Sequence, residues 1–271
     1  MSATLNPNGT LKGKVALVTG ASRGIGEAIS VRLAMEGARV VASARTAAER
    51  ESKLPGTLTE TVERITKAGG ESMFVKADLS HPEDRERLVD AAVNAYGPID
   101  ILVNNAAITY FIPVTDFPEK RFKLMMEVQV YAPFHLSQLV LPAMKERRSG
   151  SIINISSPAG IDPKPPYTRA GGGTVYGMCK AALERFSTGL ASEVYEYGIA
   201  VNAVSPGLVD TPGVAVHGLI NEHTKDRVQP IEFIAEAVYQ FATGDPKTLT
   251  GRIAYAAPLL EELAVAPRAL I

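Results

Sequence analysis

The residues with the clearest chemical potential are a tyrosine and a lysine, Tyr176 and Lys180, which stand four positions apart. On a helix, side chains at this spacing share one face. An ammonium group beside a phenol favours the phenolate and so lowers the pKa of the phenol. We therefore expect Tyr176 to exchange a proton with a carbonyl or alcohol oxygen. The same spacing occurs often by chance, so this prediction depends on the other motifs of the chain.

A glycine-rich segment, Gly20–Gly26, joins a β-branched run to a helical pattern. Its glycines allow a tight turn and let backbone N–H groups approach a pyrophosphate, while the helix N-terminus adds a partial positive charge. Strand, turn and helix follow one another in the order that a dinucleotide site needs. The alternative is a tight turn that binds nothing. The residues expected to hold the dinucleotide are Gly20, Ser22, Arg23, Gly24, Ile25 and Gly26.

Short β-branched runs alternate with longer helical patterns along the whole chain. This alternation predicts βαβ units, and hence a doubly wound parallel sheet flanked by helices in a single domain, residues 1–271. The first six runs are almost continuously apolar, which is typical of strands buried on both faces. The expected strands are Val15–Thr19, Arg39–Ser43, Ser72–Lys76, Ile99–Val103, Ser151–Ile155, Ala200–Val204 and Arg252–Tyr255, and the expected helices are Gly24–Glu36, Pro82–Tyr96, Glu119–Lys145 and Thr174–Tyr197.

Composition narrows the kinds of partner. The 28 basic and 29 acidic residues give a net charge of −1, so we expect a small-molecule partner rather than nucleic acid or an anionic membrane. Cys179 is the single cysteine, which excludes an internal disulfide and suits a reducing compartment. The chain has no apolar run long enough to span a bilayer and no apolar segment typical of a secretory signal. We expect a cytoplasmic protein without a metal site, because no cluster has zinc-ligand spacing.

These motifs together resemble the short-chain dehydrogenase/reductase family, in its simple single-domain branch, from about Gly13 to about Tyr255. The resemblance implies a Rossmann-like sheet of seven strands and hydride transfer between a nicotinamide cofactor and a carbonyl compound or secondary alcohol. It also implies assembly as a homodimer or homotetramer. The stretch Arg45–Ile65 looks like the hydroxysteroid dehydrogenase-like branch, which does not establish a steroid substrate.

The resemblance also assigns roles to positions at the expected carboxyl ends of strands. By this comparison Asp78 and Leu79 bind adenine, and Lys180 binds the nicotinamide ribose as well as acting on Tyr176. Asn104–Ala107 stands where the family usually has Asn-Asn-Ala-Gly, so Ala107 narrows the space near the cofactor. The remaining cofactor residues implied are Asn105, Tyr176, Val209 and Thr211.

Two further catalytic positions follow from the same comparison. The serine that orients the substrate matches Ser157, with Ser156 as its competitor. The fourth catalytic position is usually Asn, which helps to hold a water in a proton relay, but here it is Gln129. The extra methylene moves the amide, and a displacement of ~1 Å is costly in a preorganised site. Gln129 is therefore either an altered relay residue or structural filling.

The end of the second expected strand bears on the choice of cofactor. Relatives that prefer NAD carry Asp where this chain has Ala44, and Arg45 follows it. With Arg23 nearby, two guanidinium groups and no carboxylate suit the 2′-phosphate of NADP(H). The alternative is that Arg45 is a solvated surface residue, which leaves NAD possible.

Two long connections are expected near the substrate. In Asp162–Gly173, Tyr167 and Arg169 either meet the substrate or lie on a solvated loop. The segment 211–230 resembles a substrate-covering lid, in which His217 and His223 either contact substrate or face solvent. We expect an NADP(H)-dependent oxidoreductase. An NAD-linked alcohol dehydrogenase of the same fold and a catalytically inactive dinucleotide-binding sensor remain the alternatives.

Overall fold

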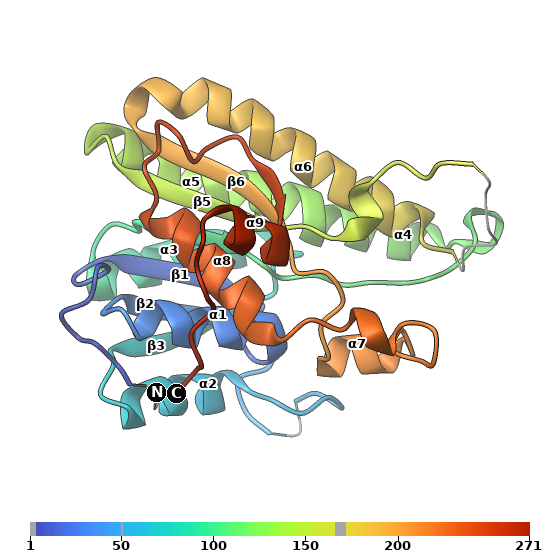
Figure 1. Ribbon diagram of the computed structural model, residues 1–271, viewed down its shortest axis with the longest axis horizontal. Helices are drawn as coiled ribbons and strands as arrows, with labels where there is room; N and C mark the ends of the chain where they lie inside the picture. Colours follow the sequence, from blue (N-terminus) through green and yellow to red (C-terminus); the bar gives the residue numbers. More distant parts are fainter. Residues whose placement is uncertain (1–3, 50, 166–171) are drawn as a thin grey trace.

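A single parallel sheet forms the centre of the computed structural model, which describes residues 4–49, 51–165 and 172–271. In that part of the chain seven strands pair in the order β3-β2-β1-β4-β5-β6-β7, and every pairing is parallel (Figure 1). The doubly wound prediction is confirmed. The strands are β1 Val15–Thr19, β2 Arg39–Ala44, β3 Ser72–Lys76, β4 Ile101–Asn104, β5 Gly150–Ile155, β6 Ile199–Ser205 and β7 Ile253–Tyr255.

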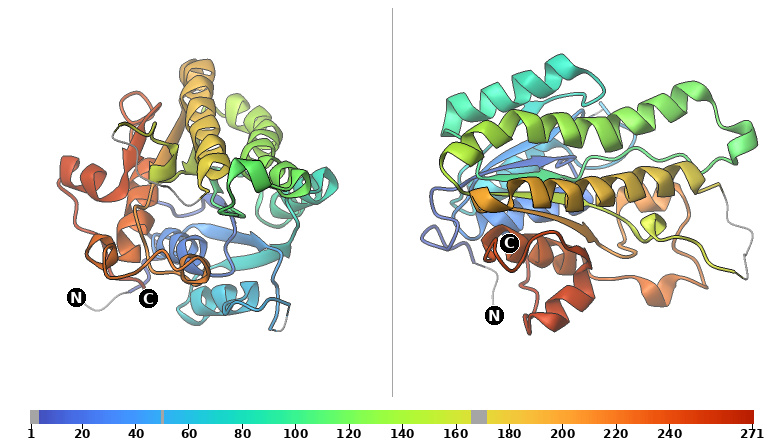
Figure 2. Two further views of the ribbon diagram at one scale, coloured as in Figure 1. Left: turned by 90° about the vertical axis from the view of Figure 1, so that its right-hand side faces the viewer. Right: turned by 90° about the horizontal axis from the view of Figure 1, so that it is seen from above.

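Helices cover both faces of the sheet. One apolar layer gathers side chains of α1, α2, α8 and α9, and the other gathers those of α3, α5 and α6, so that the sheet lies between them (Figure 2). The described helices are α1 Gly24–Ala34, α2 Leu58–Lys67, α3 Pro82–Tyr96, α4 Glu119–Met126, α5 Ala132–Glu146, α6 Thr174–Val194, α7 Pro212–Val216, α8 Ile231–Thr243 and α9 Ala256–Glu262. None of these described helices is long and apolar enough to cross a membrane.

The expectation that the first six strands are buried on both faces is wrong for β3. Phe74 in this strand is 39% exposed, and Lys76 is exposed as well. The reason is topological, since β3 lies at the edge of the sheet and pairs only with β2. The strands β1 and β6, which have neighbours on both sides, are buried at every position.

The long helix expected over residues 119–145 is interrupted. Helix α4 passes into a π-helical turn, Glu127–Tyr131, before α5 begins. Pro133 explains part of this change, because it lacks the N–H that an α-helix would direct at the carbonyl of Gln129. In the turn, Ala132 N–H instead bonds to the carbonyl of Glu127, five residues earlier. This π turn places Gln129 in the interior, with 1% of its surface exposed.

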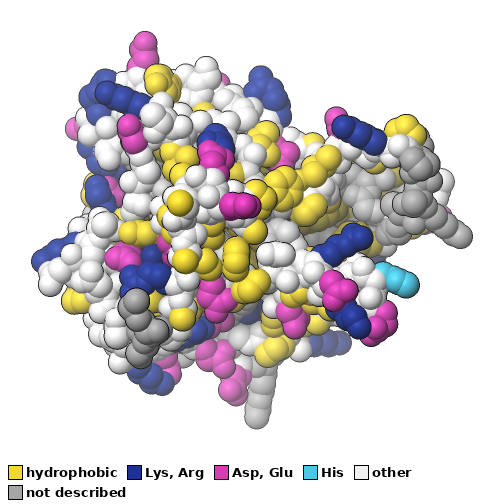
Figure 3. Space-filling view, viewed as in Figure 1, with side chains coloured by type: hydrophobic (Ala, Val, Ile, Leu, Met, Phe, Trp, Pro, Cys, Tyr) yellow, Lys and Arg dark blue, Asp and Glu magenta, His cyan; other side chains and the backbone are white. Residues whose placement is uncertain are grey.

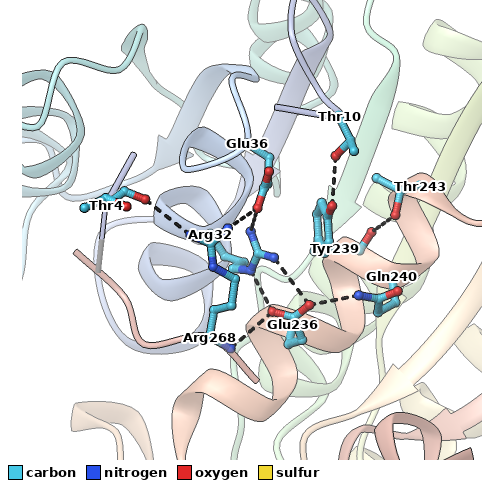
Figure 4. A network of polar contacts seen from close by, with 9 residues as sticks. All are labelled: Thr4, Thr10, Arg32, Glu36, Glu236, Tyr239, Gln240, Thr243 and Arg268. Carbon is cyan, nitrogen blue, oxygen red and sulfur yellow. Dashed lines mark hydrogen bonds and ion pairs between the residues drawn. The ribbon is translucent and has the colours of Figure 1, made fainter. Parts of the chain in front are cut away.

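A buried network of charges joins α1 to α8 (Figure 4). Arg32, only 1% exposed, donates to Glu236 at 2.7 Å and to Glu36 at 2.9 Å. Tyr239 places its ring centre 3.9 Å from the same guanidinium. Arg268 reaches the Glu36 carboxylate from the last stretch of the chain, which binds this segment to the two helices. The two glutamates thus satisfy two arginines at the end of α1 opposite the glycine turn.

Candidate active site

A cleft of about 390 Å³ opens where the carboxyl ends of the central strands meet α1. Ligands of open parallel sheets bind at this edge. Of the residues predicted to hold the cofactor, all except Tyr176, Lys180 and Val209 line the cleft. Those that line it are Gly20, Ser22, Arg23, Gly24, Ile25, Gly26, Arg45, Asp78, Leu79, Asn105 and Thr211.

The glycine turn is held too tightly for side chains. Gly20 has a φ of +66°, and a Cβ on Gly26 would lie 2.3 Å from the carbonyl oxygen of Gly20. The Asn105 amide closes the turn from the next strand, donating to the carbonyls of Thr19 at 2.8 Å and Gly20 at 3.2 Å. The backbone of the glycine turn therefore borders the cleft without intervening side chains, and such a turn fits the pyrophosphate of a dinucleotide.

The two arginines expected near a 2′-phosphate are used differently. Arg23 donates to Ser52 Oγ at 3.1 Å and to the carbonyl of Gly56 at 2.8 Å, so its guanidinium holds the loop between β2 and α2. Burial lowers the pKa of Arg23, Glu60 opposes this change, and the nearby charge of Arg45 adds to it. Arg45 is exposed and lines the cleft. Arg45 is therefore better placed than Arg23 to meet an anion.

Three of the predicted catalytic residues come together beside this cleft. Tyr176 and Lys180 lie on the first turns of α6, and the Lys180 Nζ is 5.6 Å from the centre of the Tyr176 ring. Lys180 is 3% exposed and donates to the carbonyl oxygen of Ile155, at the end of β5, at 2.8 Å. Ser157 follows two residues later, and its side chain is close enough to Tyr176 to lower the pKa of the phenol. Ile108 connects the two regions, since it lines the cleft and packs in the same apolar cluster as Tyr176.

Burial dominates the electrostatics of this group. It raises the pKa of Tyr176, and the nearby Ser157 hydroxyl opposes the change. Burial lowers the pKa of Lys180 to about 8, opposed by the nearby Cys179 and Glu184. In the protein by itself burial outweighs any effect of Lys180 on the pKa of Tyr176, so the lowering expected beside an oxidised nicotinamide stays a prediction. The ammonium is directed at the carbonyl of Ile155 rather than at the phenol oxygen.

The structure separates the two candidate serines. Ser156 is 3% exposed and donates its hydroxyl proton to Glu184 Oε1 at 2.5 Å, one helical turn after Lys180. Ser157 begins a single 3₁₀ turn, Pro158–Gly160, and faces Tyr176. This turn presses against α6, where a Cβ on Gly177 would lie 2.6 Å from the carbonyl oxygen of Ala159. Ser157 is the serine that the fold brings to the tyrosine.

Gln129 is buried near the group but is not joined to it. Its Nε2 donates to the carbonyl of Ile108 at 2.8 Å. Within the described residues its Oε1 is buried without a hydrogen-bond partner, and no hydrogen bond links it to Tyr176 or Lys180. The side chain therefore holds the loop after β4 and leaves one buried acceptor available.

Sequence reasoning missed an aromatic contact on the substrate side. The Phe111 ring centre lies 6.0 Å from that of Tyr176 and 4.9 Å from that of His217, both in edge-on arrangements. His217 ends α7 in the expected lid, and Thr211, which lines the cleft, caps the start of that helix. An aromatic residue shortly after the Asn104–Ala107 motif was the available signal. Tyr167 and Arg169 lie outside the described residues.

Comparison with known proteins decides the family. A family model described as short chain dehydrogenase matches residues 14–218. The chain belongs to this family. The short-chain dehydrogenase is 38% identical over 203 residues to an uncharacterized oxidoreductase of Thermotoga maritima, covering 75% of this chain and 74% of that protein. It is 34% identical to the mouse hydroxysteroid dehydrogenase-like protein 2, covering 94% of this chain but only 51% of that protein, so it spans about half of that relative.

Solved structures agree with this family. A metagenomic short-chain oxidoreductase in complex with NADP superposes with a TM-score of 0.73 at 31% identity, covering 90% of this short-chain dehydrogenase and 97% of that chain. The protein is thus an oxidoreductase with a Rossmann-like fold and a site for a nicotinamide dinucleotide. On the face drawn in Figure 3, basic and acidic side chains are interspersed, as its small net charge predicts.

Proposed function

We propose that the protein is an NADP(H)-dependent oxidoreductase that interconverts a carbonyl compound and a secondary alcohol. The observation that carries this proposal is the grouping of Tyr176 with the buried Lys180, whose Nζ lies 5.6 Å from the centre of the Tyr176 ring, and with Ser157, whose side chain acts on the pKa of that tyrosine. The bound dinucleotide supplies or accepts the hydride at its nicotinamide ring. The residues Gly20–Gly26, Asp78, Leu79, Val209 and Thr211 are proposed to hold it.

The protein's own groups handle the oxygen and the proton. Ser157 holds the reacting oxygen beside Tyr176, and the phenol gives it a proton during reduction or takes one during oxidation. Because burial raises the pKa of Tyr176, the phenol is fully protonated at neutral pH and ready to donate. This state favours carbonyl reduction. Oxidation requires the pKa to fall, and the positive charge of an oxidised nicotinamide acts in that direction.

Preference for NADP(H) is proposed from the end of β2. Ala44 and Arg45 both line the cleft, so an arginine and no carboxylate follows the strand at this point. An arginine can grip a phosphate with paired, charge-assisted hydrogen bonds. The NADP bound to the metagenomic relative supports this choice. NAD remains the alternative cofactor.

The same site suggests what surrounds the substrate. Phe111 borders the Tyr176 ring and His217 contacts Phe111, so we propose that residues 211–230 cover a small organic carbonyl or alcohol substrate. Self-association is a further part of the proposal. Tyr131, at the end of the π turn, and Phe134, in the first turn of α5, are 46% and 39% exposed, and exposed aromatic side chains of this kind are enriched at interfaces between subunits.

The test is oxidation of NADPH over a panel of aldehydes and ketones, with Tyr176→Phe as the diagnostic variant. We expect the variant to bind NADPH with parental affinity and to lose at least about 99% of its turnover. Tyr195→Phe is the control, because Tyr195 lies beyond the far end of α6 and is 48% exposed. If the parent bound the cofactor but turned over no substrate, the result would favour the alternative of a catalytically inactive dinucleotide-binding sensor. Gln129, which stands where the resemblance predicts a catalytic Asn, is the residue that favours this alternative.

A further inference from the structure

Arg85, in the first turn of α3, is fully buried although it carries a charge. Its Nη1 donates at 2.8 Å to the carbonyl oxygen of Leu79 and at 2.8 Å to Glu127 Oε1. Its Nε donates to His135 Nδ1 at 3.1 Å. The guanidinium carbon lies 4.8 Å from the centre of the Tyr131 ring. One side chain is thus shared between the loop after β3, the π turn and α5, and α3 and α5 lie side by side (Figure 2).

The partners of Arg85 are next to walls of the cofactor cleft. Leu79 lines the cleft. Glu127 begins the π turn, and the following residue, Val128, lines the cleft from another side. Gln129 comes next and holds the carbonyl of Ile108, a third lining residue. Neither Arg85 nor Glu127 lines the cleft itself.

The chemistry of this link suits arginine specifically. A guanidinium is a planar fork of five donors that remains charged, whereas an ammonium is a compact charge with donors on one atom. Arg85 uses two of its nitrogens for three acceptors from three segments. A lysine at this position could keep the ion pair with Glu127 but could not hold Leu79 and His135 in the same geometry.

We propose that Arg85 is a positioning residue of the cofactor cleft, which fixes the wall at Leu79 relative to the π turn that carries Val128 and Gln129. The inference rests on the proposed function, since it assumes that a nicotinamide dinucleotide fills the cleft. Cofactor affinity and the placement of Gln129 then both depend on the pair Arg85–Glu127, although neither side chain touches the cofactor.

The experiment measures NADPH affinity, by the fluorescence of the bound cofactor, together with steady-state kinetics. For Arg85→Met we expect the Kd of NADPH to rise about tenfold or more and kcat to fall, while KM for the carbonyl substrate changes less than about twofold. Arg85→Lys restores part of the loss. Glu127→Gln gives a smaller defect in the same direction. Arg85→Met combined with Glu127→Gln is no worse than Arg85→Met alone, because both changes remove one shared interaction.

Arg32→Met is the matched control for a buried arginine. Arg32 is 1% exposed and paired with Glu36 and Glu236, in the last turn of α1, away from the cleft. It should lower the melting temperature and leave the Kd of NADPH unchanged. A folded Arg85→Met protein with parental Kd and kcat would overturn the inference, as would an equal rise in Kd caused by Arg32→Met.

Glu127→Gln keeps the inference testable if Arg85→Met does not fold. The Glu127 side chain is 33% exposed, so its neutralisation is expected to be tolerated. Parental Kd and kcat in this variant would then overturn the inference. Failure of the proposed function looks different, because the parent itself would neither bind NADPH nor reduce any carbonyl compound.

Discussion

Ser156 donates its hydroxyl proton to Glu184 at 2.5 Å, which fixes the end of β5 to α6 one turn beyond Lys180. The contact brings a carboxylate near the buried ammonium, and this charge raises the pKa of Lys180 against the effect of burial. Ser157, the next residue, lies near enough to Tyr176 to lower the pKa of its phenol. Cys179, on the same helix, also raises the pKa of Lys180, and the charge of Glu184 raises the pKa of Tyr255 at the end of β7.

We expect Glu184→Gln to shift the alkaline limb of the kcat–pH profile toward lower pH. Glutamine can still accept the Ser156 hydrogen bond but carries no charge, so the pKa of Lys180 falls below its present value of about 8. Ser156→Ala is the matched control, because it removes the hydrogen bond and keeps the charge. It should cost about 1 kcal/mol of stability and leave the limb in place. Coincident profiles for Glu184→Gln and the parent would contradict the prediction.

The two arginines near the cleft should respond differently to removal. Arg45→Ala should weaken NADPH binding roughly ten- to hundredfold and leave NADH binding nearly unchanged, since a charged hydrogen bond contributes about 1.5–3 kcal/mol. Arg23→Ala should weaken both cofactors alike, because it releases the loop held at Ser52 and Gly56. Binding of both cofactors is measured by their fluorescence.

Arg252→Ala is the control for loss of an exposed positive charge, since Arg252 pairs with Glu262 and does not line the cleft. If Arg45→Ala left the ratio of NADPH to NADH affinity at its parental value, the assignment of Arg45 to the 2′-phosphate would fail.

Lys180→Met should abolish turnover but stabilise the fold at neutral pH. The pKa of Lys180 falls from 10.5 to about 8 in the folded protein, so below pH 8 the charge is held at a cost of up to about 3 kcal/mol, at ~1.4 kcal/mol per pKa unit. Between pH 8 and 10.5 the folded protein releases this proton first, and the cost declines to zero. The gain from Lys180→Met is therefore largest below pH 8 and vanishes above pH 10.5.

Urea unfolding at a series of pH values measures this gain. The lost hydrogen bond to Ile155 reduces its size but does not change its dependence on pH. A gain that increased with pH would show that the buried ammonium is not the cause.

Gln129 is tested by shortening it in two steps. Gln129→Asn draws the amide back by one methylene, to the position that the sequence resemblance predicts for a proton relay, but gives up the hydrogen bond to Ile108, so turnover should rise while stability falls by about 1 kcal/mol. Gln129→Ala should lose stability and turnover together, because it removes the amide altogether. Parental turnover in the alanine variant would eliminate a relay role and leave Gln129 as structural filling.

The strands could be predicted from the sequence to within about two residues, because buried parallel strands are short β-branched runs. The helix Pro82–Tyr96 was predicted with its observed bounds, since Pro82 and the acids after it mark a helix start. The helices α2, α7, α8 and α9 were not predicted. The hydrophobic spacing of α8, Ile231–Thr243, was a usable signal for that helix. For α2 the signal was Thr57, whose side chain caps the helix by accepting a hydrogen bond from the Glu60 N–H.

The site was predictable only where a local motif reports it. The glycine turn and the spacing of Tyr176 and Lys180 belong to one segment each, so short-range patterns reveal them. The contacts of Arg85 with Glu127 and of Ser156 with Glu184 join segments that are distant in the sequence. These contacts depend on how the helices pack on the sheet, so neither the residue types nor their spacing in the sequence predicts them. The hydrogen bond from Arg23 to Ser52 could not be predicted for the same reason.

Arg268, in the last stretch of the chain, completes a largely buried cluster of two arginines and two glutamates with no net charge. Arg32 and Arg268 together neutralise Glu36 and Glu236, and three of these four side chains are almost inaccessible to water. Trimming the protein after Leu263 would leave two carboxylates sharing a single guanidinium where little solvent can compensate. Such a shortened protein would unfold at a lower temperature than the full chain, even though the cleft at the other end of α1 is untouched.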